Sequence, residues 1–74
     1  MNVKYEKQFD DCDINYVWLH LMMNNYQIIE IKPDNDNEMY YVLMHDTDHP
    51  HYHSHATFEI GSEGGRLTVY EPIK

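Results

Sequence analysis

Two turn-forming segments, residues 33–37 and 62–65, each separate a pair of segments rich in β-branched and aromatic residues. The paired segments are residues 26–32 with 39–44, and residues 56–60 with 67–70. Such segments joined by Pro, Asp, Asn and Gly are typical of β-hairpins. Val3 and Tyr5 alternate with polar residues and suggest one more strand at the N-terminus. The sequence therefore predicts an antiparallel meander of four or five strands.

A helical pattern precedes both hairpins. From Asp13 onward, apolar residues recur three and four positions apart, a spacing that places them on one face of a helix: Ile14, Val17, Trp18, Leu21 and Met22. Asp13 suits the start of this helix, and Asn24 and Asn25 suit its end. We expect an α+β fold with one amphipathic helix packed on the sheet, and we expect Trp18, Leu21 and Met22 to lie in the core.

The chain of residues 1–74 is expected to form a single domain, near the lower size limit for a core without disulfides or metal. Cys12 is the only cysteine, which excludes an intramolecular disulfide and favours a reducing compartment such as the cytoplasm. No apolar run is long enough for a membrane span. Because Tyr40 and Tyr41 place apolar side chains on both faces of the first hairpin, a homodimer that covers the second face is predicted.

Acidic residues outnumber basic ones, with 13 Asp and Glu against 5 Lys and Arg and a formal net charge of -8. This charge has the wrong sign for direct binding to nucleic acid or to anionic lipid. No Lys or Arg lies between Lys7 and Lys32, and none lies between Lys32 and Arg66. Ordinary small domains intersperse both signs, so this segregation favours an acidic surface that binds a basic partner.

The first hairpin carries most of the acidic residues of the second long stretch. Its turn contains Asp34, Asp36 and Glu38, and Asp46 and Asp48 follow its second strand. In an extended chain, carboxylates two residues apart point the same way at a spacing of about 6.6 Å, a geometry that permits mimicry of DNA phosphates. We predict these five carboxylates as the partner-binding residues, with Asp10, Asp11 and Asp13 as a secondary cluster.

A short, acidic chain rich in Asn, Tyr and Met with a single cysteine resembles the small early proteins that lytic phages use to take over their host. The resemblance covers size and charge across the whole chain. It implies an acidic DNA mimic that binds and inhibits a basic host DNA-binding protein, such as the nucleoid protein HU or the replication sliding clamp. Such a protein would act in the host bacterial cytoplasm, without a cofactor.

The histidines suggest an alternative function. His49, His51, His53 and His55 occupy alternate positions within residues 45–55 and would project from one face of an extended strand. Imidazoles in that arrangement are ligands for zinc, nickel or copper, although Pro50 interrupts regular strand pairing. We expect residues 47–55 to form an irregular polar connection. The histidines would either bind metal or tune the charge with pH.

Catalytic motifs are absent from the sequence. It contains no nucleophile elbow, no glycine-rich phosphate loop followed by Lys, and no H-E-x-x-H segment. A domain of this size also offers little concavity in which a side chain could be activated. We therefore predict that the protein is not an enzyme.

Overall fold

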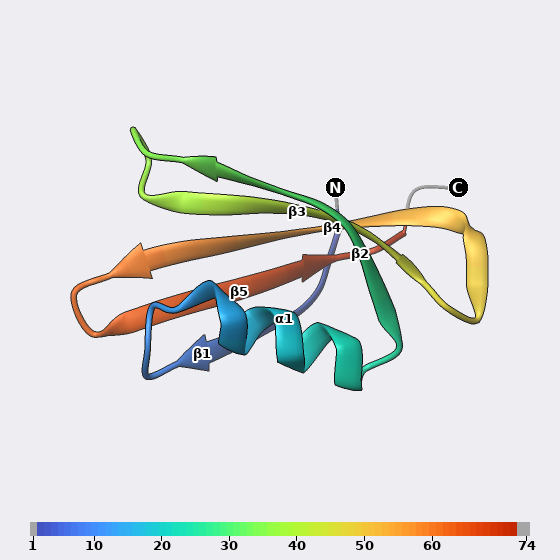
Figure 1. Cartoon of the computed structure of the whole chain (residues 1–74), viewed down its shortest axis with the longest axis horizontal. Coiled ribbons are helices and arrows are strands. Elements are labelled where there is room, and N and C mark those ends of the chain that lie inside the picture. The colour runs from blue at the N-terminus through green and yellow to red at the C-terminus, as the bar shows by residue number, and fades with distance from the viewer. Residues whose placement is uncertain (1, 73–74) are drawn as a thin grey trace.

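Short turns connect consecutive strands through most of the chain, which builds an antiparallel sheet. The computed structural model describes residues 2–72. Its elements in chain order are β1 (Val3–Phe9), α1 (Ile14–Met23), β2 (Tyr26–Asp34), β3 (Met39–Asp46), β4 (His49–Gly61) and β5 (Gly64–Tyr70). The strand order is β1-β5-β4-β3-β2, so β2 to β5 form a meander and β1 joins beside β5 (Figure 1). This confirms the predicted α+β fold of one helix on a five-stranded antiparallel sheet.

Capping residues fix both ends of α1. The Asp13 carboxylate accepts a hydrogen bond of 2.9 Å from the Asn15 backbone N–H, one of the donors left unpaired at a helix start. At the other end, the Asn24 backbone N–H donates to the Leu21 carbonyl, and Asn25 adopts a left-handed conformation with φ 66°. The predicted helix boundaries are therefore confirmed.

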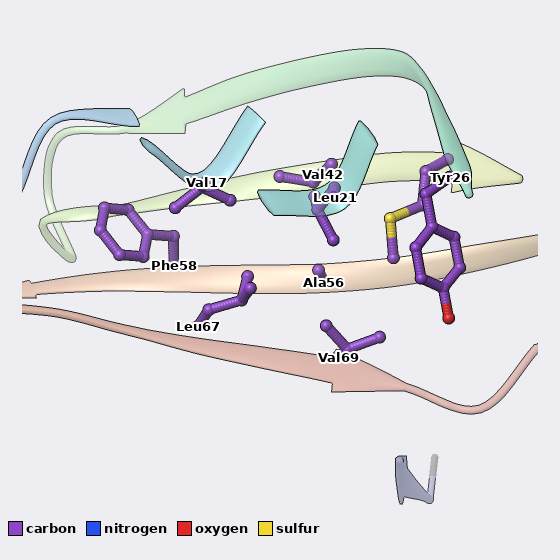
Figure 2. Packing of buried hydrophobic residues seen from close by; sticks show 9 residues of the cluster. Val17, Leu21, Tyr26, Val42, Ala56, Phe58, Leu67 and Val69 are labelled. Atoms are coloured by element: carbon purple, nitrogen blue, oxygen red, sulfur yellow. The ribbon is translucent and has the colours of Figure 1, made fainter. Parts of the chain in front are cut away.

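The core lies between α1 and one face of the sheet. Val17 and Leu21 point from the helix toward the strands (Figure 2). They form a buried cluster with apolar side chains of β2 to β5: Tyr26, Val42, Met44, Ala56, Phe58, Leu67 and Val69. The expectation that Trp18 and Met22 would join this core is wrong, because both are exposed. Trp18 follows the buried Val17, and Met22 follows the buried Leu21. Each is therefore rotated about 100° around the helix axis, away from the side of α1 that contacts the sheet.

The histidine-rich segment is not the irregular connection that we expected. β4 begins at His49, and Thr47 and Asp48 form the turn that joins it to β3. β3 pairs His45 with His53 and Asp46 with His49, so residues 50–52 have no partner on β3. Such a bulge accommodates a proline, which has no N–H to donate to the ladder. His and Pro have low β propensity, so the sequence did not indicate a strand at these residues. Pairing with the neighbouring strand β3 stabilises it.

Among residues 2–72, no helix covers the opposite face of the sheet. Cross-strand partners on this face include Tyr41 beside Thr57, and Thr57 beside Thr68. Tyr41 is exposed as predicted, whereas Tyr40 lies on the core side and packs against the buried cluster. The centre of this face therefore combines an exposed aromatic side chain with threonines.

The loops sort into two groups by the end of the sheet at which they lie. The β1–α1 loop, the β2–β3 turn and the β4–β5 turn lie at one end, the left end of Figure 1. The β3–β4 turn, the α1–β2 connection, the start of β1 and the end of β5 lie toward the other. There the Glu71 backbone N–H donates a 2.8 Å hydrogen bond to the Asn2 carbonyl. Within residues 2–72, no helix has the length and apolar character needed to cross a membrane.

Candidate functional site

Three loops bring acidic residues from distant parts of the sequence to one end of the sheet. We call this surface the acidic end and define it by seven residues: Asp10, Asp11, Asp13, Asp34, Asp36, Glu38 and Glu63. The loops that carry them contain no Lys or Arg. In the strand order, the β4–β5 turn lies between the other two loops and is adjacent to both. The acidic end therefore extends across the whole width of the sheet.

Backbone contacts hold these loops in position. The Ile60 N–H donates a 2.8 Å hydrogen bond to the Glu38 carbonyl, which ties the β2–β3 turn to β4. Gly64 lies so close to the Phe9 carbonyl that a side chain would not fit between them, which ties the β4–β5 turn to the end of β1. The carboxylates of the acidic end are thus carried by fixed backbone.

The β2–β3 turn corrects the predicted row of carboxylates. Residues 35–38 form a turn and not an extended strand, because the Asp34 carboxylate accepts hydrogen bonds from the side chain of Asn37 and from the backbone of Asp36 and Asn37. The Asn37 amide in particular lowers the pKa of the Asp34 carboxyl below its ordinary value. Asp34 therefore stays ionised to lower pH, but Asp34, Asp36 and Glu38 do not repeat at strand spacing.

Some acidic-end carboxylates serve the local fold. Asp11 accepts a 2.9 Å hydrogen bond from the Asp13 backbone N–H, and Asp13 caps α1. Within residues 2–72, the structure shows no hydrogen bond or ion pair for the side chains of a second group: Asp10, Asp36, Glu38 and Glu63. All four are exposed. These four are available for a partner.

The cations nearest to the acidic end are occupied elsewhere. Arg66 forms a 3.0 Å ion pair with Glu59 on the helix-free face of the sheet. The Lys7 ammonium lies 5.5 Å from the centre of the Phe9 ring, in a cation–π contact. Lys32 on β2 lies 3.7 Å from a Glu30 carboxylate oxygen. The negative potential of the three loops is therefore not cancelled by a direct ion pair with any of these three residues.

The structure separates the five primary carboxylates into two groups. Asp34, Asp36 and Glu38 lie at the acidic end together with the secondary cluster, whereas Asp46 and Asp48 lie at the other end of β3. Asp46 is half-buried and accepts a 2.8 Å hydrogen bond from the Asp48 backbone N–H. Sequence reasoning missed Glu63, which the register of the second hairpin brings to the acidic end.

The histidines of β4 do not share one face as predicted, because the bulge at residues 50–52 breaks the alternation. His49 stacks on Tyr52, and its Nδ1 lies 3.9 Å from an Asp46 oxygen. His53 lies opposite His45, whose Nε2 is 2.9 Å from the Gln27 side-chain oxygen. Among residues 2–72, no group of three or more His, Cys, Asp or Glu side chains is placed to hold a metal ion. The predicted metal alternative therefore lacks a site in this part of the chain.

One histidine outside that segment is built into the fold. His20 on α1 makes T-shaped ring contacts with both Tyr5 and Phe9, and its Nε2 lies 3.0 Å from the Tyr5 hydroxyl. Burial lowers the pKa of His20 below its ordinary value of 6.5, and the Lys7 charge lowers it further. The neutral ring is therefore the form that the folded state favours.

Acidification should destabilise the protein through His20. Below pH 6.5, the unfolded chain protonates this residue before the folded one does, so the free energy of unfolding falls as pH decreases from 6.5 toward the lowered pKa. We expect a His20→Gln variant, which retains a polar side chain that can hydrogen-bond to Tyr5, to lose less stability than the wild type between about pH 7.5 and 5.5. Urea unfolding of both proteins at the two pH values measures the difference. Equal losses would contradict this role of His20.

Comparisons with known proteins give no family for this chain. No protein-family model matches the sequence, and neither a curated protein nor a solved structure shows significant similarity to it.

Proposed function

We propose that this protein binds a basic DNA-binding protein through its acidic end and excludes DNA from that surface by occupying it. The observation that supports this most is the convergence of three cation-free loops, from three separate parts of the sequence, at one end of the sheet. Acidic residues that only keep a protein soluble can be spread over its whole surface. Acidic residues that take the place of DNA phosphates must lie together on one surface. The action is one of occupancy, without catalysis and without a cofactor.

The arrangement of the acidic loops suits a surface that holds duplex DNA. The three loops present carboxylates in separate groups across the sheet, as the two strands of a duplex present separate rows of phosphates on either side of a groove. Lys and Arg side chains that contact phosphates on both sides of a groove could then contact two loops of the acidic end at once. A nucleoid protein of the HU type and a sliding clamp, both in the bacterial cytoplasm, are the partners that we propose.

Competition with DNA tests this function. A purified HU-type protein carrying a fluorescent duplex should release the duplex when this protein is added at low salt, and should release much less at several hundred millimolar salt, because screening weakens charged contacts. The same assay with a sliding clamp loaded on DNA covers the second partner. Release that does not depend on salt would contradict an electrostatic contact, and the absence of release from either would reject both partners.

Neutralising the acidic end should weaken this competition. The variant Asp10→Asn, Asp36→Asn, Glu38→Gln and Glu63→Gln removes the four carboxylates that serve no local hydrogen bond. We expect the affinity for the basic partner to fall by about 10- to 100-fold, since each lost charge leaves a partner cation without its contact. Titration calorimetry at low salt gives the affinity, and circular dichroism shows that the fold is retained.

A matched variant separates the acidic end from net charge. Replacing Glu6, Glu30, Asp48 and Glu71 by their amides removes the same number of exposed charges away from the acidic end. This control should bind within a few-fold of the wild type. An equal loss in both variants would show that total charge matters and not its placement. A loss in the control alone would assign binding to surfaces such as the β3–β4 turn, where Asp46 and Asp48 lie.

A further inference from the structure

The outer surface of α1 is unusually apolar. The helix contains no Asp, Glu, Lys or Arg. Five large side chains of α1 are exposed: Tyr16 51%, Trp18 44%, Leu19 57%, Met22 56% and Met23 74%. At about 100° per residue, they cover an arc of about 160° on the side away from Val17 and Leu21. Asn15 is the one polar side chain within this arc. A helix without charged residues is normally buried on most of its surface, yet the protein's own sheet covers only one side of this one.

The exposed arc is large enough to form an interface. At these exposed fractions, the five side chains present on the order of 500 Å² of surface, near the upper limit for patches on monomeric proteins. Trp, Tyr and Met are also residues enriched at interfaces, while the depletion of charge matches the centre of an interface. Trp18 and Met22 continue this surface onto β2, where they line a hollow with Tyr26 and Ile28.

We propose that this surface is covered by α1 of a second copy of the chain, in a two-fold symmetric dimer. Two such surfaces in contact bury about 1,000 Å² in total, at the lower limit for a specific interface. Because α1 carries no charged side chain, the contact places no like charges directly against each other, although each chain has a net charge of -8. A small domain in which α1 buries two residues, Val17 and Leu21, also gains stability from the added burial.

Charge determines how the two helices are oriented. α1 begins next to the acidic end, because Asp10, Asp11 and Asp13 directly precede it. Parallel pairing would bring two acidic ends side by side and align the helix dipoles unfavourably, whereas antiparallel pairing separates the acidic ends and opposes the dipoles. The dimer is therefore antiparallel, with its two-fold axis near Leu19, the central residue of the exposed arc.

The dimer goes beyond the proposed function and differs from it in its response to salt. Screening reduces repulsion between two acidic chains, so added salt strengthens the dimer, whereas it weakens the contact between the acidic end and a basic partner. The two proposals can therefore fail independently. A dimer that strengthens with salt stands even if no DNA-binding protein is recognised.

Sedimentation equilibrium tests the dimer directly. The wild type should shift from the monomer mass of 9.0 kDa toward twice that mass as its concentration rises toward about 200 µM, and the shift should begin at lower concentration in higher salt. Leu19→Glu places two carboxylates near the two-fold axis, and we expect it to raise the dimer Kd by about 30-fold or more. Tyr41→Glu, an exposed change on the helix-free face, is the matched control and should leave the Kd unchanged.

The alternative outcomes overturn the proposal. A wild type that remains monomeric at the highest concentration rejects the dimer. If only Tyr41→Glu dissociates the dimer, the helix-free face of the sheet is the interface. If the protein is monomeric and Leu19→Glu abolishes binding to the HU-type protein, α1 contacts the basic partner instead of a second copy.

Cysteine cross-linking tests the antiparallel arrangement. The native Cys12 is exposed in the β1–α1 loop, so antiparallel helices separate the two Cys12 residues by more than the helix length of about 15 Å. Under mild oxidation the wild type should remain uncross-linked, and Leu19→Cys in a Cys12→Ser background should form a covalent dimer. Tyr41→Cys in the same background should not. Cross-linking through Cys12 without cross-linking through residue 19 would overturn the antiparallel arrangement.

Discussion

Phe58→Ala should leave most of the protein unfolded at room temperature. Phe58 is fully buried, and its ring packs edge-on against Phe9 at a centroid distance of 5.8 Å. Truncating a buried Phe costs about 3–5 kcal/mol, and a small core of this kind rarely supplies more than that in total. Far-UV circular dichroism and urea unfolding measure the loss.

A matched surface change isolates the effect of the core. Tyr41→Ala also removes an aromatic ring, from the neighbouring strand β3, but this ring is exposed on the opposite face of the sheet. We expect it to change the free energy of unfolding by about 1 kcal/mol or less. If Phe58→Ala unfolds with the same urea midpoint as Tyr41→Ala, Phe58 does not hold the core together.

Gly64→Ala should have the second largest effect on stability. Gly64 has φ 130°, a conformation that residues with a side chain rarely adopt, and an added Cβ would collide with the Phe9 carbonyl. Neither backbone segment can move without breaking the pairing of β1 with β5. Strain and displacement together should cost about 3 kcal/mol. Thermal unfolding gives the change in stability.

Gly61, on the β4 side of the same turn, provides the control. Gly61 pairs with Gly64 across the β4–β5 turn, but a Cβ at Gly61 would make only an ordinary 3.7 Å contact with the Gly64 carbonyl. Gly61→Ala should therefore change the stability by about 1 kcal/mol or less. Comparable losses at both positions would mean that the turn itself, and not the contact between Gly64 and Phe9, is sensitive. Because Glu63 lies in this turn, Gly64→Ala should also disturb the acidic end.

The sequence predicted the elements that are fixed by interactions between residues close together in the chain. Asp13 and Asn24 mark the helix ends because caps act within one turn, and residues 33–37 mark a hairpin because turn chemistry is local. The first half of β4 was missed because pairing with β3 stabilises a segment whose own residues have little preference for a strand. The exposure of Trp18 was also missed, since periodicity gives an apolar face but not how much of that face the sheet covers.

The acidic end was only partly predictable. The sequence identifies the acidic residues of the first turn and of the segment before α1, but it cannot show that Asp10 and Asp36 lie at the same end of the sheet. That depends on β1 joining the far side of the meander beside β5, a pairing between residues more than 50 positions apart. The second hairpin brings Glu63 to the same end, whereas Asp46 and Asp48 lie at the end of β3 remote from Glu38.

The hydrogen bond between Glu71 and Asn2 joins the two described ends of the chain at the side remote from the acidic end. An affinity tag or a surface linker attached at either end would therefore hold the molecule with its acidic loops facing outward. A short peptide that joins these ends could also permit new termini in another loop with the strand order unchanged. In binding assays with the immobilised protein, attachment near Asn2 or Glu71 would therefore leave the acidic end accessible to a partner in solution.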